Sequence, residues 1–333
     1  MDWPSLAPQV ALADRLFGAR GAKMLGVWLH EQAARITDPA FARLFSDHID
    51  LPGVAPGDYN HRLVRAGRGR LLGGVRFYGK DLARPFVEVV AHDFEDWEAL
   101  TSCVAAEWAT FAPLHLRTLV APRAAFPPGA HIDMAIHAAR YGDMAPPDGR
   151  VALAPFADAE DAVATVSAKY EELTRTEPAL ARNISAADAD ELRRWHREGR
   201  IQAIRAMVDC TERTVGLLAA APGAVEWIEG DEVNEEVVLR AFNGQGFAAL
   251  AQRAWAARAD LDPGRLLIGT IDGLNTASRR SALRAGREAV LDYALLPVDR
   301  GRRGEPSQHT GQGTACSSHM GCPRPSERFR GQV

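Results

Sequence analysis

The stretch Phe242-Asn243-Gly244-Gln245-Gly246-Phe247-Ala248 joins an apolar strand to an amphipathic helix through a glycine-rich turn. The apolar run Val237-Val238-Leu239 comes before the turn. Apolar residues recur at helical spacing after it, namely Phe247, Leu250, Ala251, Ala254 and Trp255. A helix that starts at glycines presents backbone N–H groups without intrahelical partners, and its N-terminus carries the positive end of the helix dipole. The stretch therefore predicts a site where a phosphate can approach bare backbone.

Composition narrows the class of protein. The chain has 333 residues, of which 47% are hydrophobic, so it can bury a sizeable core and is long enough for about two domains. With 39 basic and 43 acidic residues the net charge is -4, which argues against a general affinity for nucleic acid or anionic membrane. There is no apolar run of membrane-spanning length and no signal-peptide pattern, and the four cysteines are scattered. These features predict a cytoplasmic protein.

The first part of the chain alternates between helical and strand periodicity. Residues 1–48 show helical spacing, and 61–66 and 71–78 read as two strands of a hairpin. Residues 85–90 predict a third strand, a helix follows after Asp93 or Asp96, and strands are expected at 114–120 and 132–138.

The Pro-Pro-Asp-Gly segment at 146–149 marks a boundary, after which the same kinds of element return. The remaining predicted strands are 151–156, 201–209, 214–218, 232–239 and 266–271. Helices are expected after Asp158, after Ser185, at the glycine turn and at 276–286.

The order of elements is similar in the two parts: helices, a hairpin, a strand, a helix and a strand. This indicates a diverged internal repeat, with domains at 1–145 and 151–298. The first copy reads His92-Asp93-Phe94-Glu95-Asp96 where the second has its glycines, and those carboxylates would repel phosphate. Residues 299–333 are poor in apolar residues and predict a disordered tail. The set His309, Cys316, His319 and Cys322 in that tail is too cramped to predict zinc, so no metal is expected.

Residues 243–248 resemble the acyl-CoA pyrophosphate motif of the GNAT N-acetyltransferase superfamily, [Gln/Arg]-x-x-Gly-x-[Gly/Ala], at the strand-to-helix turn where that family has it. Asn243 departs from the usual Gln or Arg. A second segment, Asn275 to Gly286, is similar to the helix that flanks the pantetheine arm in that family. The resemblance implies an α/β (α+β) fold, a mixed sheet flanked by helices, in two tandem copies of which the first is degenerate. It also implies acetyl-CoA as acyl donor, bound by Asn243, Gly244, Gln245, Gly246, Phe247, Ala248 and Asn275.

The resemblance leaves the catalytic residues open. Many family members use a Glu on the strand before the turn as base, which here corresponds to Glu232 or, as second choice, Glu236. Strict alternation would put these two on one face of the strand and Glu235 on the other. An equally simple interpretation is that this acidic run is a solvated hairpin. The family's acid, a Tyr on the last helix, is replaced by Ala282, which leaves Tyr293 or water to protonate the thiolate.

These features predict a monomeric or homodimeric N-acetyltransferase that acts by direct attack of a small-molecule or peptide amine, without nucleic acid or membrane partners. The absence of the Tyr keeps a second hypothesis open, a non-catalytic acyl-CoA sensor or interaction module. A third hypothesis, binding of nucleic acid through an arginine-rich helix and the tail, is disfavoured by the net charge.

Overall fold

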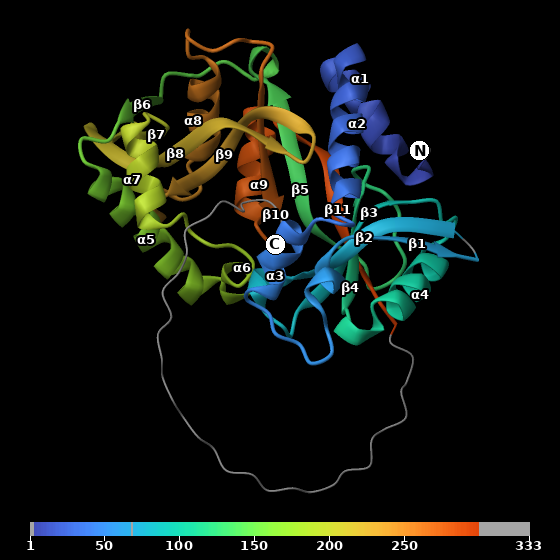
Figure 1. Cartoon of the computed structure of the whole chain (residues 1–333). Helices are drawn as coiled ribbons and strands as arrows, with labels where there is room; N and C mark the ends of the chain where they lie inside the picture. Colours follow the sequence, from blue (N-terminus) through green and yellow to red (C-terminus); the bar gives the residue numbers. More distant parts are fainter. Residues whose placement is uncertain (1–2, 68, 300–333) are drawn as a thin grey trace, which may run out of the picture.

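A computed structural model describes residues 3–67 and 69–299 of the chain (Figure 1). The predicted disordered tail, apart from Asp299, and the His309–Cys322 set lie outside the described residues. The described chain forms one mixed sheet of 11 strands in the order β1-β2-β3-β4-β11-β5-β10-β9-β8-β7-β6, flanked by helices. This confirms the predicted fold class.

The strands lie close to the predicted ones. They are β1 (Arg62–Ala66), β2 (Gly69–Phe77), β3 (Pro85–His92), β4 (His115–Val120), β5 (His131–Arg140), β6 (Val151–Pro155), β7 (Ile201–Val208), β8 (Thr211–Val225), β9 (Ile228–Val238), β10 (Leu266–Asp272) and β11 (Glu288–Pro297). The hairpin of β8 and β9 is longer than expected, and its turn falls at Glu226 and Trp227. The acidic residues 232–236 therefore lie within a paired strand and not in a solvated turn.

The helices are α1 (Ala7–Phe17), α2 (Ala19–Ala34), α3 (Pro39–Ser46), α4 (Trp97–Glu107), α5 (Ala159–Thr176), α6 (Pro178–Ala181), α7 (Ala189–Arg197), α8 (Phe247–Ala256) and α9 (Thr276–Ala285). Side-chain caps start several of them: Asp96 and Asp158, as the sequence predicted, and also Asn275 each accept a hydrogen bond from a backbone N–H in the first turn. No helix among the described residues is long and apolar enough to cross a membrane.

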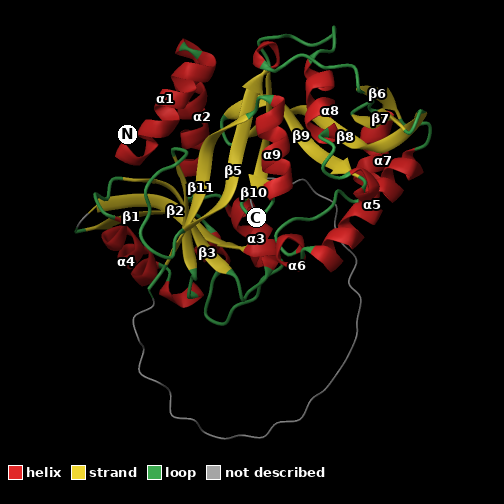
Figure 2. Cartoon of the chain, turned by 180° about the vertical axis from the view of Figure 1, so that it is seen from behind, coloured by secondary structure: helices red, strands yellow, loops and turns green. Residues whose placement is uncertain are grey.

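The two parts of the chain exchange their last strands. β5, the last strand of the first part, lies between β11 and β10, whereas β11, at the end of the second part, lies between β4 and β5 (Figure 2). The central pair β5 and β11 is antiparallel and makes the sheet continuous from one part to the other. The domain limits 1–145 and 151–298 stay a prediction, because the single sheet runs through both parts without a boundary between them.

The register of β5 and β11 shows an internal two-fold relation. A constant offset of 157 residues converts His131 to Glu288 and Ala138 to Leu295, and the pair Glu288–Ala138 is thereby converted to Leu295–His131. The same offset relates the two register shifts of this ladder, which fall at Asp133 and Val290. Neighbouring strands obey the relation as well, because Ala138 pairs with Ile268 and Leu295 pairs with Arg117. The tandem arrangement is thus visible in the pairing itself.

The relation extends to the strand that carries the acidic residues. β3 has an extra residue, Val90, opposite β2, and β9 has an extra residue, Asn234, at the corresponding place opposite β8. Counting from these bulges, Glu88 is the counterpart of Glu232. The parallel ladders agree, since Glu88 pairs with Arg117 and Glu232 with Ile268.

Candidate functional site

The glycine turn is open and has left-handed backbone. Gly244 and Gly246 have φ values of +79° and +82°, and a Cβ added at either would meet no atom within 4 Å. Gly246 is the N-cap of α8, and no side chain caps this helix. Phe247 is buried and packs edge-on against Phe242 at 6.5 Å, which anchors the start of the helix. The turn therefore presents free N–H groups at a helix N-terminus, as the sequence predicted.

The corresponding place in the first part is closed by its own carboxylates. Asp96 caps α4 and accepts a hydrogen bond from Ala99 N at 2.6 Å, and Asp93 pairs with Arg70 at 2.7 Å. The helix dipole is already compensated there, so no phosphate site remains at α4.

The parallel strands β9 and β10 separate before they reach the glycine turn. Their ladder consists of two residue pairs, Asp231–Leu267 and Glu232–Ile268, and the strands are unpaired from there to the turn. The equivalent strands β3 and β4 pair at four positions, from Phe86 to Val89. In the second part the two parallel strands are therefore unpaired from Glu232 and Ile268 toward the glycine turn, and this unpaired section is called the split below.

Helix α9 borders the same region and packs against α8 on one face of the sheet (Figure 2). Asn275 caps α9 through its side-chain oxygen, which accepts a hydrogen bond from Ser278 N at 3.0 Å. Gly286 ends the helix with a φ of +102°. Both ends of the predicted helix are confirmed, while contact between Asn275 and a pantetheine arm stays a prediction.

The bulge at Asn234 changes the faces on which the acidic residues lie. Glu236 Oε1 accepts a hydrogen bond from Gln252 of α8 at 2.7 Å. Glu235 lies on the opposite face, where its carboxylate accepts hydrogen bonds from Tyr170 of α5 and from Ala187 N. These two residues alternate as predicted.

The expected position of Glu232 was wrong. Val233 belongs to the apolar cluster under α8, on the same face as Glu236, because the extra residue Asn234 interrupts the alternation. Glu232 therefore points to the other face, together with Glu235. The two candidate bases approach the split from opposite sides of the sheet, which the sequence pattern alone could not show.

Glu236 belongs to a buried polar chain. Gln252 is fully buried and joins Glu236 to Arg287, whose Nε donates to Gln252 Oε1 at 2.9 Å. Burial raises the pKa of Glu236, and the positive charge of Arg287 opposes this in part. A carboxyl group with a raised pKa is suited to accept a proton near neutral pH.

Tyr293 does not lie near Glu236 or the split. It is fully buried on β11, and its hydroxyl donates a 2.5 Å hydrogen bond to Glu226 Oε1 at the turn between β8 and β9. Burial and the nearby carboxylate of Glu226 raise its pKa. At about 3.3 Å per residue, Glu226 lies on the order of 20 Å along the strand from Val233. The structure therefore keeps Tyr293 apart from the split and the glycine turn.

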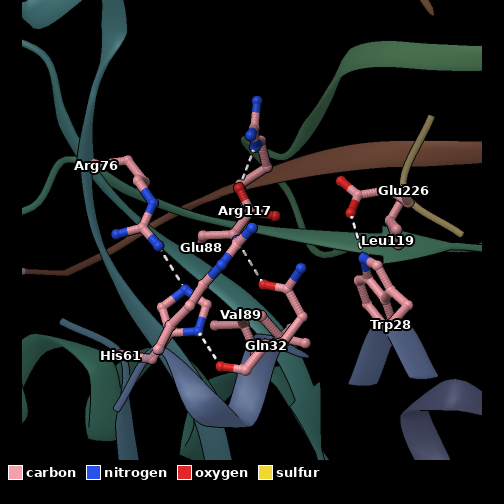
Figure 3. Close-up of a pocket in the computed structure, with 11 residues that line it drawn as sticks. Trp28, Gln32, His61, Arg76, Glu88, Val89, Arg117, Leu119 and Glu226 are labelled. Carbon is pink, nitrogen blue, oxygen red and sulfur yellow. Dashed lines mark hydrogen bonds and ion pairs between the residues drawn. The ribbon is translucent and has the colours of Figure 1, made fainter. Parts of the chain in front are cut away.

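A second polar cluster, around Arg117, lies in the first part (Figure 3). It lines a small cavity of about 20 Å³, partly open to solvent, together with Trp28, Gln32, Arg35, His61, Arg76, Glu88 and Glu226. Arg117 is 2% exposed and donates to Glu88 at 2.6 Å and to Asp133 at 3.2 Å. Burial opposes the charge of Arg117, but the two carboxylates outweigh it and raise its pKa. Because Glu88 is the counterpart of Glu232, the first part has its equivalent carboxylate bound to an arginine.

The sequence did not predict the cluster around Arg117. Its one signal is a pair of arginines, Arg76 and Arg117, inside otherwise apolar strands. Glu226 comes from the β8–β9 turn, about 110 residues after Arg117, and accepts a hydrogen bond from Trp28 at 2.9 Å.

His61 makes this cluster sensitive to pH. Burial and the neighbouring Arg76 lower its pKa well below 6.5, so the folded protein holds it neutral while the unfolded chain binds a proton. Its contribution to stability is present above about pH 6.5 and is lost as the pH falls toward the folded pKa. When the pH is lowered from 6.5 to 5.5, the free energy of unfolding should decrease by up to about 1 kcal/mol less in His61→Gln than in wild type. Urea titrations measure this, with exposed His30→Gln as control; parallel curves for wild type and His61→Gln would contradict it.

A further cavity lies where the two parts meet. It measures about 120 Å³, is partly open to solvent, and is lined by Tyr78, Arg84, His115, His131, Asp133 and Asn183 among others. Arg84, from the turn between β2 and β3, donates to Asn183 of the loop between α6 and α7 at 2.8 Å. The first part thus supplies one wall to the second. No cluster of metal-ligating side chains occurs within residues 3–67 and 69–299.

Comparison with known proteins gives structural neighbours only. No family model matches the chain. No curated protein matches it either. Similar solved structures include a GCN5-related N-acetyltransferase from Sphaerobacter thermophilus, with 16% identity, a TM-score of 0.42, and coverage of 73% of this chain and 81% of the other. An acetyltransferase of the GNAT family from Colwellia psychrerythraea has 10% identity and a TM-score of 0.39, over 77% and 94% of the two chains.

A tandem GNAT protein from the clavulanic acid biosynthesis pathway is also similar, with 17% identity, a TM-score of 0.36, and coverage of 84% and 96%. All three neighbours have less than 20% identity to this chain and a TM-score below 0.5. At such TM-scores and identities they carry no argument about activity, which has to rest on the residues described above.

Proposed function

We propose that the chain is an acyl-CoA-dependent N-acyltransferase that uses its second part, with acetyl-CoA as donor and a primary amine of a small molecule or peptide as acceptor. The observation that carries the proposal is the coincidence of two features: bare glycines at the start of α8 and the split between β9 and β10 that leads to them. The resemblance of residues 243–248 to an acyl-CoA motif supports the same ligand.

The residues present suit such a donor. Free N–H groups from Gln245 to Ala248 would hold the pyrophosphate at the positive end of the α8 dipole. The pantetheine arm would lie along the split, beside Asn275 and α9. An added Cβ at Gly244 or Gly246 would meet no atom, so the ligand can reach the backbone.

The reaction is a direct transfer. The amine nitrogen forms a bond to the thioester carbonyl carbon, the C–S bond breaks, and its electron pair leaves on sulfur. Glu232 or Glu236 takes the proton that the nitrogen loses, and a proton finally reaches the thiolate, which gives an amide and CoA. Glu236 has the raised pKa, and Glu232 lies on the face of α5, away from α8.

Thiol release from acetyl-CoA, measured across a panel of primary amines, tests the activity. We expect release with at least one amine and a fall of about 10²–10⁴-fold in kcat in Glu232→Gln or Glu236→Gln, whichever removes the base. Glu191→Gln, on the surface helix α7, is the control and should match wild type. Release that is unchanged in both test variants would exclude both carboxylates as bases.

The sensor hypothesis is retained because Ala282, buried in α9, stands where a tyrosine acid is expected. It predicts binding of acetyl-CoA without thiol release for every amine tested. That result would replace catalysis by ligand-dependent interaction as the function.

A further inference from the structure

Arg287 is buried beside the split, and part of its hydrogen-bonding capacity is unused. The residue follows Gly286 at the end of α9 and is 2% exposed. Its Nε is bound to Gln252, but no hydrogen-bond partner for Nη1 occurs among the described residues. A buried guanidinium N–H without a partner is costly, because desolvation of the group is not compensated.

The guanidinium lies at the closed end of the split. An ideal Cβ on Gly269 would be 3.3 Å from Arg287 Nη1 and 3.6 Å from Val233 Cβ. Gly269 and Val233 directly follow the last paired residues, Ile268 and Glu232. The absence of a side chain at Gly269 thus leaves room for the arginine where the two strands separate.

The other end of the split is the glycine turn. The unpaired section of β9, from Val233 to Val238, is about 17 Å long at about 3.3 Å per residue. A donor held by its phosphates at Gly246 and extended along this section would bring its thioester toward Val233 and Gly269. The reacting atoms would then arrive next to Arg287.

An ion pair with Glu236 does not explain why Arg287 is buried at this place. The carboxylate reaches Arg287 only through Gln252, and these two charged groups form no direct ion pair. The backbone carbonyl of Arg287 is bonded to His137 Nδ1 at 3.0 Å, which fixes the arginine from β5. The arginine is therefore held from α8 and β5, while Nη1 remains available.

We infer, on the basis of the proposed acyl transfer, that Arg287 is a catalytic residue whose guanidinium contacts the thioester sulfur and stabilises the thiolate as the C–S bond breaks. The electron pair of that bond passes to sulfur, and the positive charge compensates it until a proton arrives. In a site with little water such a charge acts more strongly than at the surface. Arg287 thus stabilises the leaving thiolate, a role that the methyl side chain of Ala282 cannot fill.

The thiol of bound CoA reports this interaction directly. We expect its pKa, followed by the ultraviolet absorbance of the thiolate, to be about one unit lower in wild type than in Arg287→Gln, which is a tenfold difference in the ratio of thiolate to thiol at any one pH. The other ionisable groups near Arg287 are Glu236 of β9, Tyr141 before β6 and His137 of β5. They are unchanged in the comparison. Arg280→Gln, at an exposed position on α9, should titrate like wild type.

A CoA analogue without the sulfur atom distinguishes the contribution of the thiol from that of the rest of the ligand. Above the pKa of the bound thiol, CoA should bind wild type about tenfold more tightly than Arg287→Gln, whereas CoA lacking the sulfur atom should bind both equally. Arg287→Lys keeps the positive charge and should restore a lowered thiol pKa, which covers the case in which Arg287→Gln does not fold.

The outcomes are distinct. Failure of CoA to bind wild type would overturn the proposed function. Binding of CoA with the same thiol pKa in wild type and Arg287→Gln would overturn the role of Arg287 and leave the proposed function intact. If neither variant folds while wild type binds CoA without a lowered thiol pKa, the role of Arg287 is also overturned.

Discussion

Replacing Arg117 by methionine is expected to destabilise the protein by about 3–5 kcal/mol, the range for removal of one partner from a buried ion pair. The guanidinium is 2% exposed and bridges Glu88 and Asp133, so its loss leaves two carboxylates in the interior without their cation. It also lies 4.8 Å from the ring centres of Phe86 and Tyr293, and methionine replaces those contacts only in part. Urea unfolding monitored by circular dichroism measures the change.

A surface arginine provides the comparison. Arg193 forms ion pairs with Glu160 and Asp190 on the outside of α5 and α7, so Arg193→Met should leave the urea midpoint nearly unchanged. Equal effects of the two substitutions would show that Arg117 does not hold the cluster together. In Glu88→Gln/Asp133→Asn both carboxylates are neutral, and adding Arg117→Met to this background should cost much less than in wild type.

The cluster around Arg117 also marks a structural difference between the two parts. Glu88 is related to Glu232 by the bulges and by the strand register, but Arg117 stands where the second part has Ile268. The arginine in that position forms an ion pair with the carboxylate of Glu88. At this position the first part therefore has a buried ion cluster where the second part has the split.

Local features of the fold were predictable from sequence. Helix starts follow from capping residues such as Asp96 and Asp158, and the glycine turn follows from Gly244 and Gly246 between a strand and a helix. These signals depend on residues within a few positions of each other. The exchange of β5 and β11 depends on pairing between residues about 150 positions apart, which no local pattern encodes.

The site was predictable to the same extent. The cradle residues are recognisable because glycine chemistry and helix periodicity coincide at one place. The faces of Glu232 and Glu236 were not, because one extra residue at Asn234 reverses the alternation. The sequence left Tyr293 as a candidate acid for the thiolate. Its strand β11 lies between β4 and β5, and its hydroxyl donates to Glu226 instead. The sequence shows Arg287 only as one of several arginines near the end of the predicted helix, and its position next to Gly269 depends on the fold.

Substitution of Gly246 by glutamate is expected to abolish donor binding. Gly246 has a φ of +82°, so any side chain there is strained, and a carboxylate at the N-cap of α8 would occupy the positive end of the dipole in place of a phosphate. Gly149→Glu is a matched control, because Gly149 has a φ of +81° in the exposed segment before β6 and an added Cβ would meet no atom within 4 Å. It adds the same charge and the same backbone penalty away from the turn.

The thermal shift caused by acetyl-CoA tests the central claim most directly. At a concentration about 100 times the Kd, a ligand that binds the folded state adds about 2.7 kcal/mol of stability, enough to raise the Tm by several degrees. Acetyl-CoA should raise the Tm of wild type and of Gly149→Glu equally and leave that of Gly246→Glu unchanged. Equal stabilisation of Gly246→Glu, or no stabilisation of wild type, would contradict an acyl-CoA site at residues 243–248.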